Sequence, residues 1–216
     1  MRDVTTTFLQ PHDRVLLTGD SVTDGGRDRD DPASLGHGYA AIVAALAGAR
    51  RPDLALTFLN RGVGGDTSAM LRARWERDAL ALSPTVVSVL IGINDTWRRY
   101  DSGVRTSTGA YEEHLRAMLD AARERLDARL VLVEPFLVPV DAAQHGWRED
   151  LDPRISVVRR LAAEHRAVLV PADGLFAAAA VRTGPTHWVS DGVHPTPAGF
   201  GLLAEAWLDA VGVPGR

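Results

Sequence analysis

The chain has 216 residues, carries 24 Lys and Arg against 28 Asp and Glu for a net charge of −4, and contains no cysteine. This length predicts one domain spanning residues 1–216, and the lack of cysteine excludes disulfides, a thiolate nucleophile and thiolate-bound metals. The acidic balance gives no sign of a nucleic-acid partner. The start, MRDVTTTFLQPHD, lacks the apolar core of a signal peptide, and no run approaches the about 18 apolar residues of a membrane span. We therefore expect a cytoplasmic protein without membrane contact.

Five short apolar runs alternate along the chain with longer amphipathic segments. The runs are rich in Val, Leu and Ile, as is typical of buried parallel strands, and cover 14–18, 55–59, 85–91, 129–133 and 167–170. Helices are predicted over about 36–50, 67–82, 109–127, 150–166, 173–182 and 196–211. This alternation predicts an α/β fold with a five-stranded parallel sheet between layers of helices. Because ligands bind at the carboxyl ends of such strands, functional residues are expected in the loops that follow them.

A serine after the first strand and a histidine before the last helix have neighbours that suit nucleophilic catalysis. Ser21 ends the tripeptide Gly19-Asp20-Ser21, and a serine hydroxyl needs a neighbouring base to act as a nucleophile. His194 lies three residues after Asp191, so one turn can place the carboxylate against Nδ1 and leave Nε2 free to face a serine. Alone, Ser21 also fits a helix-capping turn, and Asp191 with His194 fits a turn before a helix that starts at a proline.

Two further loops carry candidate donors for an oxyanion. Three glycines lie within four positions of the loop 60–67, and Gly65 could aim its N–H at developing negative charge. A phosphate-binding loop competes but lacks the Gly-Lys-Ser/Thr signature, and a flexible strand–helix turn also stays open. Asn94 follows the third strand, where its amide is a neutral donor or simply part of an Asn-Asp turn. Together these loops would supply a nucleophile, a base, an orienting carboxylate and oxyanion donors at one sheet edge.

The order of these motifs resembles that of a known enzyme superfamily. From about Arg14 to the last helix, the chain matches the four blocks of the SGNH (GDSL) hydrolases with Gly19-Asp20-Ser21, Gly65, Gly92-x-Asn94-Asp95 and Asp191-x-x-His194. The resemblance implies a flavodoxin-like three-layer α/β/α fold. It further implies a carboxylic ester hydrolase with Ser21 as nucleophile, a triad completed by Asp191 and His194, and no metal or cofactor. The oxyanion hole would then consist of the N–H groups of Ser21 and Gly65 and the side chain of Asn94.

A narrower resemblance concerns the intracellular acetylxylan esterases. It rests on Ser21-Val22-Thr23-Asp24, Gly36-x-Gly38-Tyr39, Ala73-Arg74-Trp75-Glu76 and the stretch from Gly92 to Tyr100, GINDTWRRY. That branch removes acetyl groups from xylo-oligosaccharides and tends to form homo-oligomers, which implies an acetylated sugar as substrate here. Its members carry a tryptophan directly before the triad aspartate, whereas this chain has Ser190 there and Trp188 two residues earlier.

Substrate contacts are expected from residues near the predicted site. Asp20, Trp97, Tyr100 and Trp188 are the candidates, since an aromatic face can stack on a sugar. The competing interpretation is that Trp97, Trp147 and Trp188 pack under long loops, and Trp75 and Trp207 are expected in the core. The aspartates of the segment 24–32 fit no calcium-loop spacing and are interpreted as a solvated loop.

Three other functions stay open. A thioesterase or lysophospholipase would use the same triad on longer acyl chains. A metal-dependent phosphoesterase would use Asp20, Asp191 and His194, and a non-catalytic carbohydrate-binding module would rely on the loop tryptophans.

Overall fold

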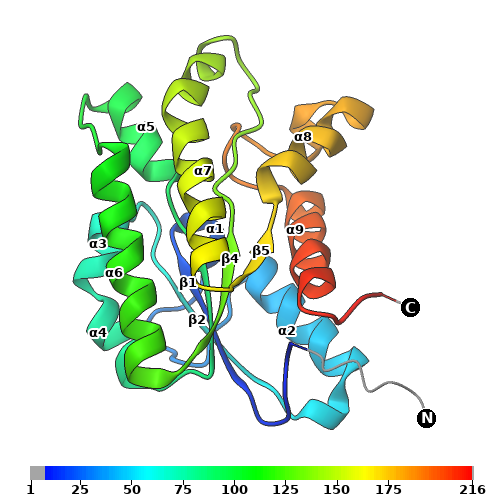
Figure 1. Cartoon of the computed structure of the whole chain (residues 1–216). Coiled ribbons are helices and arrows are strands. Elements are labelled where there is room, and N and C mark those ends of the chain that lie inside the picture. Colours follow the sequence, from blue (N-terminus) through cyan, green and yellow to red (C-terminus); the bar gives the residue numbers. More distant parts are fainter. Residues whose placement is uncertain (1–7, 216) are drawn as a thin grey trace.

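Five parallel strands form the sheet in the computed structural model, which describes residues 8–215 (Figure 1). They are β1 (Arg14–Gly19), β2 (Thr57–Gly62), β3 (Val86–Leu90), β4 (Arg129–Val133) and β5 (Val168–Val170). Their order is β2-β1-β3-β4-β5 and every neighbouring pair is parallel. This is the flavodoxin-like order, so the predicted α/β fold with a five-stranded parallel sheet is confirmed. Residues 1–7, part of the start in which we expect no signal peptide, lie outside the described residues.

Helices cover both faces of the sheet, as expected for strands that are apolar on both sides (Figure 1). One face carries α2 (Tyr39–Arg50), α8 (Ala172–Thr183) and α9 (Pro197–Ala210), and the other carries α3 (Ser68–Ala73), α4 (Trp75–Asp78), α6 (Thr108–Leu126) and α7 (Arg148–Glu164). Val15 and Leu17 of β1 pack into the first layer and Leu16 into the second, because successive side chains of a strand point to opposite faces. Trp75 and Trp207 are buried, as predicted.

The shorter elements lie mainly in the connections between strands and helices. The helices α1 (Ser21–Asp24) and α5 (Ile93–Asp101) follow β1 and β3, and 3₁₀ turns span Pro52–Leu54, Leu80–Leu82, Ala143–Trp147 and Pro185–His187. Thr67, Ser107 and Thr196 begin α3, α6 and α9, and each side chain accepts a hydrogen bond from a backbone N–H of the first turn. Because β1 and β3 are neighbours whose connections leave in opposite directions along the sheet, their carboxyl ends flank the switch point at which such folds bind ligands.

Three predicted elements differ from the structure. β2 begins two residues later than expected, because Ala55 has a left-handed φ of 47° at the end of a turn, and it continues to Gly62. The helix predicted over 67–82 is interrupted at Arg74, whose guanidinium reaches back to Asp66. Residues 93–101 form α5 where a loop was expected, and the buried side of that helix is mostly polar.

No helix within residues 8–215 is both long enough and apolar enough to cross a membrane. That residues 1–216 form a single domain stays a prediction.

Candidate active site

Ser21 is held at the carboxyl end of β1 by the residues just before it. Gly19 has a φ of 153°, and a Cβ atom there would lie 1.9 Å from the carbonyl oxygen of Leu90, so only glycine lets β1 end so close to β3. Asp20 caps α1, with its Oδ1 accepting a hydrogen bond of 3.1 Å from the N–H of Val22. Ser21 is therefore the first residue of a fixed helical turn, and it is half-buried.

His194 and Asp191 lie in the segment before α9, and they reach Ser21 from the other end of the chain. Ser21 Oγ lies 2.9 Å from His194 Nε2, and His194 Nδ1 lies 2.6 Å from Asp191 Oδ2. A carboxylate only accepts hydrogen bonds, so Nδ1 donates to Asp191, and Nε2 is left to accept from the serine hydroxyl. The structure thus joins the three predicted residues in one chain of hydrogen bonds.

The Asp191 carboxylate is fixed by more than the imidazole. Its Oδ1 accepts from the backbone N–H groups of Val193 at 3.0 Å and His194 at 2.8 Å. Burial raises the pKa of Asp191, but these hydrogen bonds and the one from the His194 ring outweigh burial and lower the pKa below its ordinary value. Asp191 is therefore held as a carboxylate that accepts the hydrogen bond from His194 Nδ1.

The two other predicted donors, Gly65 and Asn94, belong to or contact the loop that follows β2. Gly64 is close enough to Ser21 that a Cβ atom added to it would lie 3.8 Å from the serine Cβ. Gly65 follows with a φ of 85°, and Asn94 reaches the same loop, because its Nδ2 donates a hydrogen bond of 3.0 Å to the carbonyl oxygen of Asp66. Asn94 is only 6 % exposed. The loop 62–66 is thus close to Ser21 through Gly64 and is tied to Asn94 through Asp66, while the oxyanion hole stays a prediction.

Two residues that support this corner were not singled out from the sequence. Asp24 is buried rather than solvated, and its Oδ2 accepts from the N–H of Gly64 at 2.9 Å and from Arg29 at 2.8 Å. Burial raises the pKa of Asp24, but these contacts lower it below its ordinary value. Arg74 donates to the carbonyl oxygen of Gly19 and to the Asp66 carboxylate. Both residues fall in the blocks that resemble the acetylxylan esterases, which was the available signal.

Successive contacts between aromatic rings lead from His194 to Trp97, Trp147 and Tyr100. The ring of Trp97 lies 5.9 Å from that of His194 and 5.4 Å from that of Trp147, centroid to centroid. Tyr100 stacks on Trp147 at 5.2 Å and is 37 % exposed. Trp147 is buried, so it supports the other rings. The Nε1 of Trp188 instead donates a hydrogen bond of 2.7 Å to the hydroxyl of Thr183, and its ring meets that of His187 edge to face.

Asp20 lies beneath the site rather than on its surface. It is 1 % exposed, and it lines a cavity of about 10 Å³ together with apolar residues such as Val22 and Phe136. Burial raises its pKa from 3.8 to about 7. The hydrogen bond that Asp20 accepts from Val22 fixes the turn at Ser21, and a contact between Asp20 and substrate stays a prediction. Among residues 8–215, no group of three or more His, Asp or Glu side chains is arranged to hold a metal ion.

Comparison with known protein families finds a match over most of the chain. The model of the GDSL-like lipase/acylhydrolase family matches residues 17–202. The chain belongs to this family. Family membership makes it an acyl esterase, a carboxylic ester hydrolase.

Individual proteins similar to this GDSL-like hydrolase include an acetylxylan esterase and an α/β hydrolase. It is 34 % identical over 207 residues to an acetylxylan esterase from Geobacillus stearothermophilus, covering 93 % of this chain and 94 % of that protein. A crystal structure of that esterase superposes with a TM-score of 0.89 at 33 % identity, covering 96 % of this chain and 99 % of the other. An α/β hydrolase enzyme from the metagenome of Lake Arreo, Spain, gives a TM-score of 0.90 at 29 % identity and covers 97 % of this chain and 100 % of that one.

Proposed function

We propose that this protein is a serine esterase that removes O-acetyl groups from small carbohydrates such as acetylated xylo-oligosaccharides. The observation that carries the proposal is the chain of hydrogen bonds from Ser21 through His194 to Asp191, with separations of 2.9 Å and 2.6 Å. This chain provides a nucleophile, a base and an orienting carboxylate, which together make a serine hydroxyl reactive.

The proposed reaction has two halves that use the same groups. In the first, Ser21 Oγ gives its proton to His194 Nε2 and bonds to the acetyl carbon, while the ester bond to the sugar oxygen breaks. His194 returns the proton to the leaving sugar hydroxyl, and Asp191 stabilises the imidazolium in between. In the second half, water gives a proton to His194 and bonds to the acetyl carbon, the bond from that carbon to Ser21 Oγ breaks, and His194 returns the proton to Oγ, which releases acetate and restores Ser21.

The negative charge of each tetrahedral intermediate would be stabilised by three donors. These are the N–H groups of Ser21 and Gly65 and the side-chain amide of Asn94, which is held against the loop 62–66 by its bond to Asp66. Asp24 and Arg74 act through this loop and not on the substrate, because their hydrogen bonds go to Gly64, Asp66 and Gly19. We therefore treat both as positioning residues.

Two observations support an acetylated sugar as substrate. The relative at 34 % identity is an acetylxylan esterase, and structures of it include catalytic mutants in which a serine or an aspartate is replaced by alanine. In this chain Trp97 and Tyr100 lie on the His194 side of the site, where aromatic faces suit the apolar face of a sugar ring. We propose Trp97 and Tyr100 as sugar contacts and Trp188 as a more distant one.

The resemblance to intracellular acetylxylan esterases also supports proposals about where the enzyme acts and whether it forms oligomers. We propose that it acts in the cytoplasm on imported oligosaccharides and assembles as a homo-oligomer. Cell fractionation and light scattering of the purified protein test these two points.

The decisive experiment compares wild-type protein with Ser21→Ala on a panel of esters that includes acetylated xylo-oligosaccharides, with released acetate as the readout. We expect Ser21→Ala, folded by circular dichroism, to lose acetate release and to form no acyl-enzyme detectable by mass spectrometry. Ser156→Ala, which removes a hydroxyl bonded to the α7 backbone, is the matched control and should keep full activity. Wild-type rates from Ser21→Ala would refute the mechanism.

The same panel separates the alternatives. A preference for acyl chains of eight or more carbons over acetyl would favour a thioesterase or lysophospholipase. Phosphoester cleavage blocked by a chelator would favour the metal-dependent phosphoesterase, and sugar binding without any acyl-enzyme would favour a carbohydrate-binding module.

A further inference from the structure

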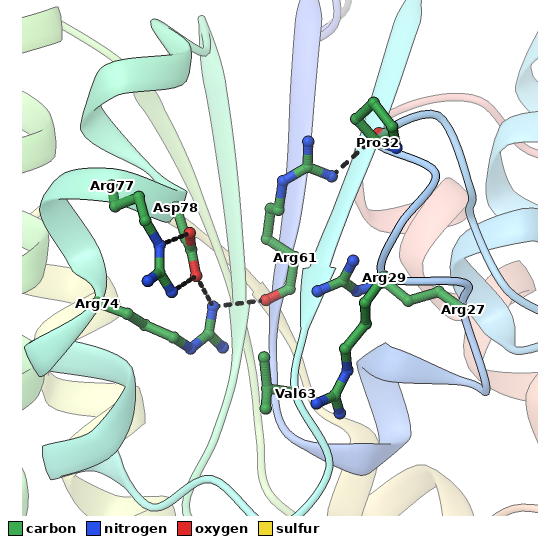
Figure 2. A pocket seen from close by; sticks show the side chains of 8 residues that line it. All are labelled: Arg27, Arg29, Pro32, Arg61, Val63, Arg74, Arg77 and Asp78. Atoms are coloured by element: carbon green, nitrogen blue, oxygen red, sulfur yellow. Dashed lines mark hydrogen bonds and ion pairs between the residues drawn. The ribbon is translucent and has the colours of Figure 1, made fainter.

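A cavity of about 410 Å³ lies beside the edge strand β2, and its lining includes Arg61 of that strand and Val63 of the loop that follows it. Five of its eight lining residues are arginines: Arg27, Arg29, Arg61, Arg74 and Arg77. Figure 2 shows Arg74 and Arg77 on one side of the cavity and Arg27 and Arg29 on the other, with Arg61 between them. We call this cavity the arginine pocket.

The arginines outnumber the carboxylates that pair with them. Arg29 pairs with Asp24, and Arg77 pairs with Asp78. Arg74 pairs with both Asp66 and Asp78. The five guanidinium groups therefore have three carboxylates among them, which leaves an excess of two positive charges.

The excess resides on Arg27 and Arg61. Within residues 8–215, the hydrogen bonds found for these two side chains go to backbone carbonyl oxygens, from Arg27 to Gly62 and from Arg61 to Pro32 and Asn60. Burial lowers the pKa of Arg27, and the positive charges of Arg61 and Arg29 lower it further, although Asp24 opposes them. An anion in the pocket would relieve this repulsion, and guanidinium groups bind planar carboxylates in a two-pronged geometry.

The arginine pocket is joined to the active site through the loop 62–66. Val63 lines the pocket, while the next residue, Gly64, comes within 3.8 Å of the Ser21 Cβ when a Cβ atom is added to it. The Asp24 carboxylate bridges Arg29 of the pocket and the N–H of Gly64. The volume of about 410 Å³ falls within the range of small-ligand sites, so the pocket has room for a sugar residue.

We propose that the arginine pocket binds a carboxylate carried by a sugar neighbouring the acetylated one, so that the enzyme prefers acetylated oligosaccharides with an acidic substituent. This inference rests on the proposed function, because it assumes that the ester and the acid belong to one substrate. Arg27 and Arg61 are the residues that meet the carboxylate, since their charges have no carboxylate partner among the hydrogen bonds and ion pairs of the described residues.

The test uses two acetylated xylo-oligosaccharides that differ at one group, a glucuronic acid in the first and its carboxyl-reduced, neutral counterpart in the second. We expect wild-type kcat/KM, read by released acetate, to be about tenfold higher for the acidic substrate, the size expected for hydrogen bonds to a charged group. Arg61→Gln should bring the ratio of the two values close to one. Arg72→Gln is the matched control, because it removes an equal charge from α3 outside the pocket lining and should keep the ratio.

A binding experiment keeps this test independent of catalysis. Calorimetry with Ser21→Ala should give a lower Kd for the acidic oligosaccharide than for the neutral one, and adding Arg61→Gln should remove the difference. If wild-type protein releases no acetate from either sugar but this binding difference holds, the proposed function fails and the anion site stands. If Arg61→Gln does not fold, Arg27→Gln takes its place, since the hydrogen bond found for the Arg27 side chain also goes to a backbone carbonyl oxygen and not to a carboxylate.

Three results would overturn the proposal. The first is equal kcat/KM and equal Kd for the acidic and neutral sugars. The second is a ratio that Arg61→Gln and Arg72→Gln change alike. The third is a lower molar mass of the assembly in Arg61→Gln, which would assign the pocket to a contact between copies of the chain.

Discussion

Replacing Asp20 by asparagine should make the stability of this protein less dependent on pH. The Asp20 carboxyl is 1 % exposed, and its Oδ2 has no hydrogen-bond partner among the described residues. Burial raises its pKa from 3.8 to about 7, and the nearby charges of Asp95 and Asp66 add to the rise. Asp20→Asn keeps an oxygen that can accept from the Val22 N–H, so it removes the ionisation while it preserves the cap of α1.

The direction and size of the effect follow from proton linkage. Between pH 4 and pH 7 the folded wild-type protein keeps the Asp20 proton that the unfolded chain has already lost, so rising pH favours unfolding. Each pH unit in this window costs up to about 1.4 kcal/mol, and above pH 7 both states are ionised and the loss levels off. The free energy of unfolding of Asp20→Asn relative to wild type should therefore rise by about 2 kcal/mol between pH 5 and pH 7.

Urea unfolding followed by circular dichroism at pH 5, 6, 7 and 8 measures this difference. Asp30→Asn, which removes an exposed carboxylate from the neighbouring loop, is the matched control. A difference between Asp20→Asn and wild type that stays constant or shrinks from pH 5 to pH 7 would refute the reasoning. So would the same trend in Asp30→Asn.

Three further outcomes concern single contacts of the site. Asn94→Ala should lower kcat for p-nitrophenyl acetate by roughly 10²–10³ with little change in KM, as for loss of one oxyanion donor, and an unchanged kcat would remove Asn94 from that role. Trp97→Ala should raise KM for acetylated xylo-oligosaccharides up to about tenfold and leave KM for p-nitrophenyl acetate nearly unchanged, whereas equal changes would indicate a structural role. Gly19→Ala should lower the free energy of unfolding by about 3 kcal/mol or more, because its Cβ would lie 1.9 Å from the Leu90 carbonyl oxygen, and a wild-type urea midpoint would contradict that contact.

The sheet could be predicted from the sequence because its strands consist mainly of aliphatic residues. β1, β3 and β4 lie where continuous Val and Leu runs indicated them. α5 could not be found in this way, because the side that it buries consists largely of Asn94, Asp95 and Thr96. Asp95 accepts hydrogen bonds from both the N–H and the hydroxyl of Ser68, so this helix is fixed by polar contacts that leave no hydrophobic period.

Those residues of the candidate site that directly follow strands could be predicted from the sequence. Ser21 and Asn94 lie directly after β1 and β3, and a parallel sheet brings such positions to one edge. Asp24 positions the loop 62–66 because its carboxylate accepts a hydrogen bond from the N–H of Gly64, which lies 40 residues further along the chain. Spacing alone does not reveal such a contact, and Asp24 therefore looked like one acid among several in a charged segment.

The two halves of the proposed site come from distant parts of the chain, since Ser21 and His194 are 173 positions apart. His194 reaches the serine because the segment that carries it leads into α9, which is docked on the sheet where Trp207 donates a hydrogen bond to Ser88. Under the proposed mechanism, no esterase activity arises during synthesis or refolding before α9 has docked, even when the strands are already paired. If the proposed mechanism holds, ester hydrolysis reports on the completion of folding, and a fragment that ends before His194 has no activity.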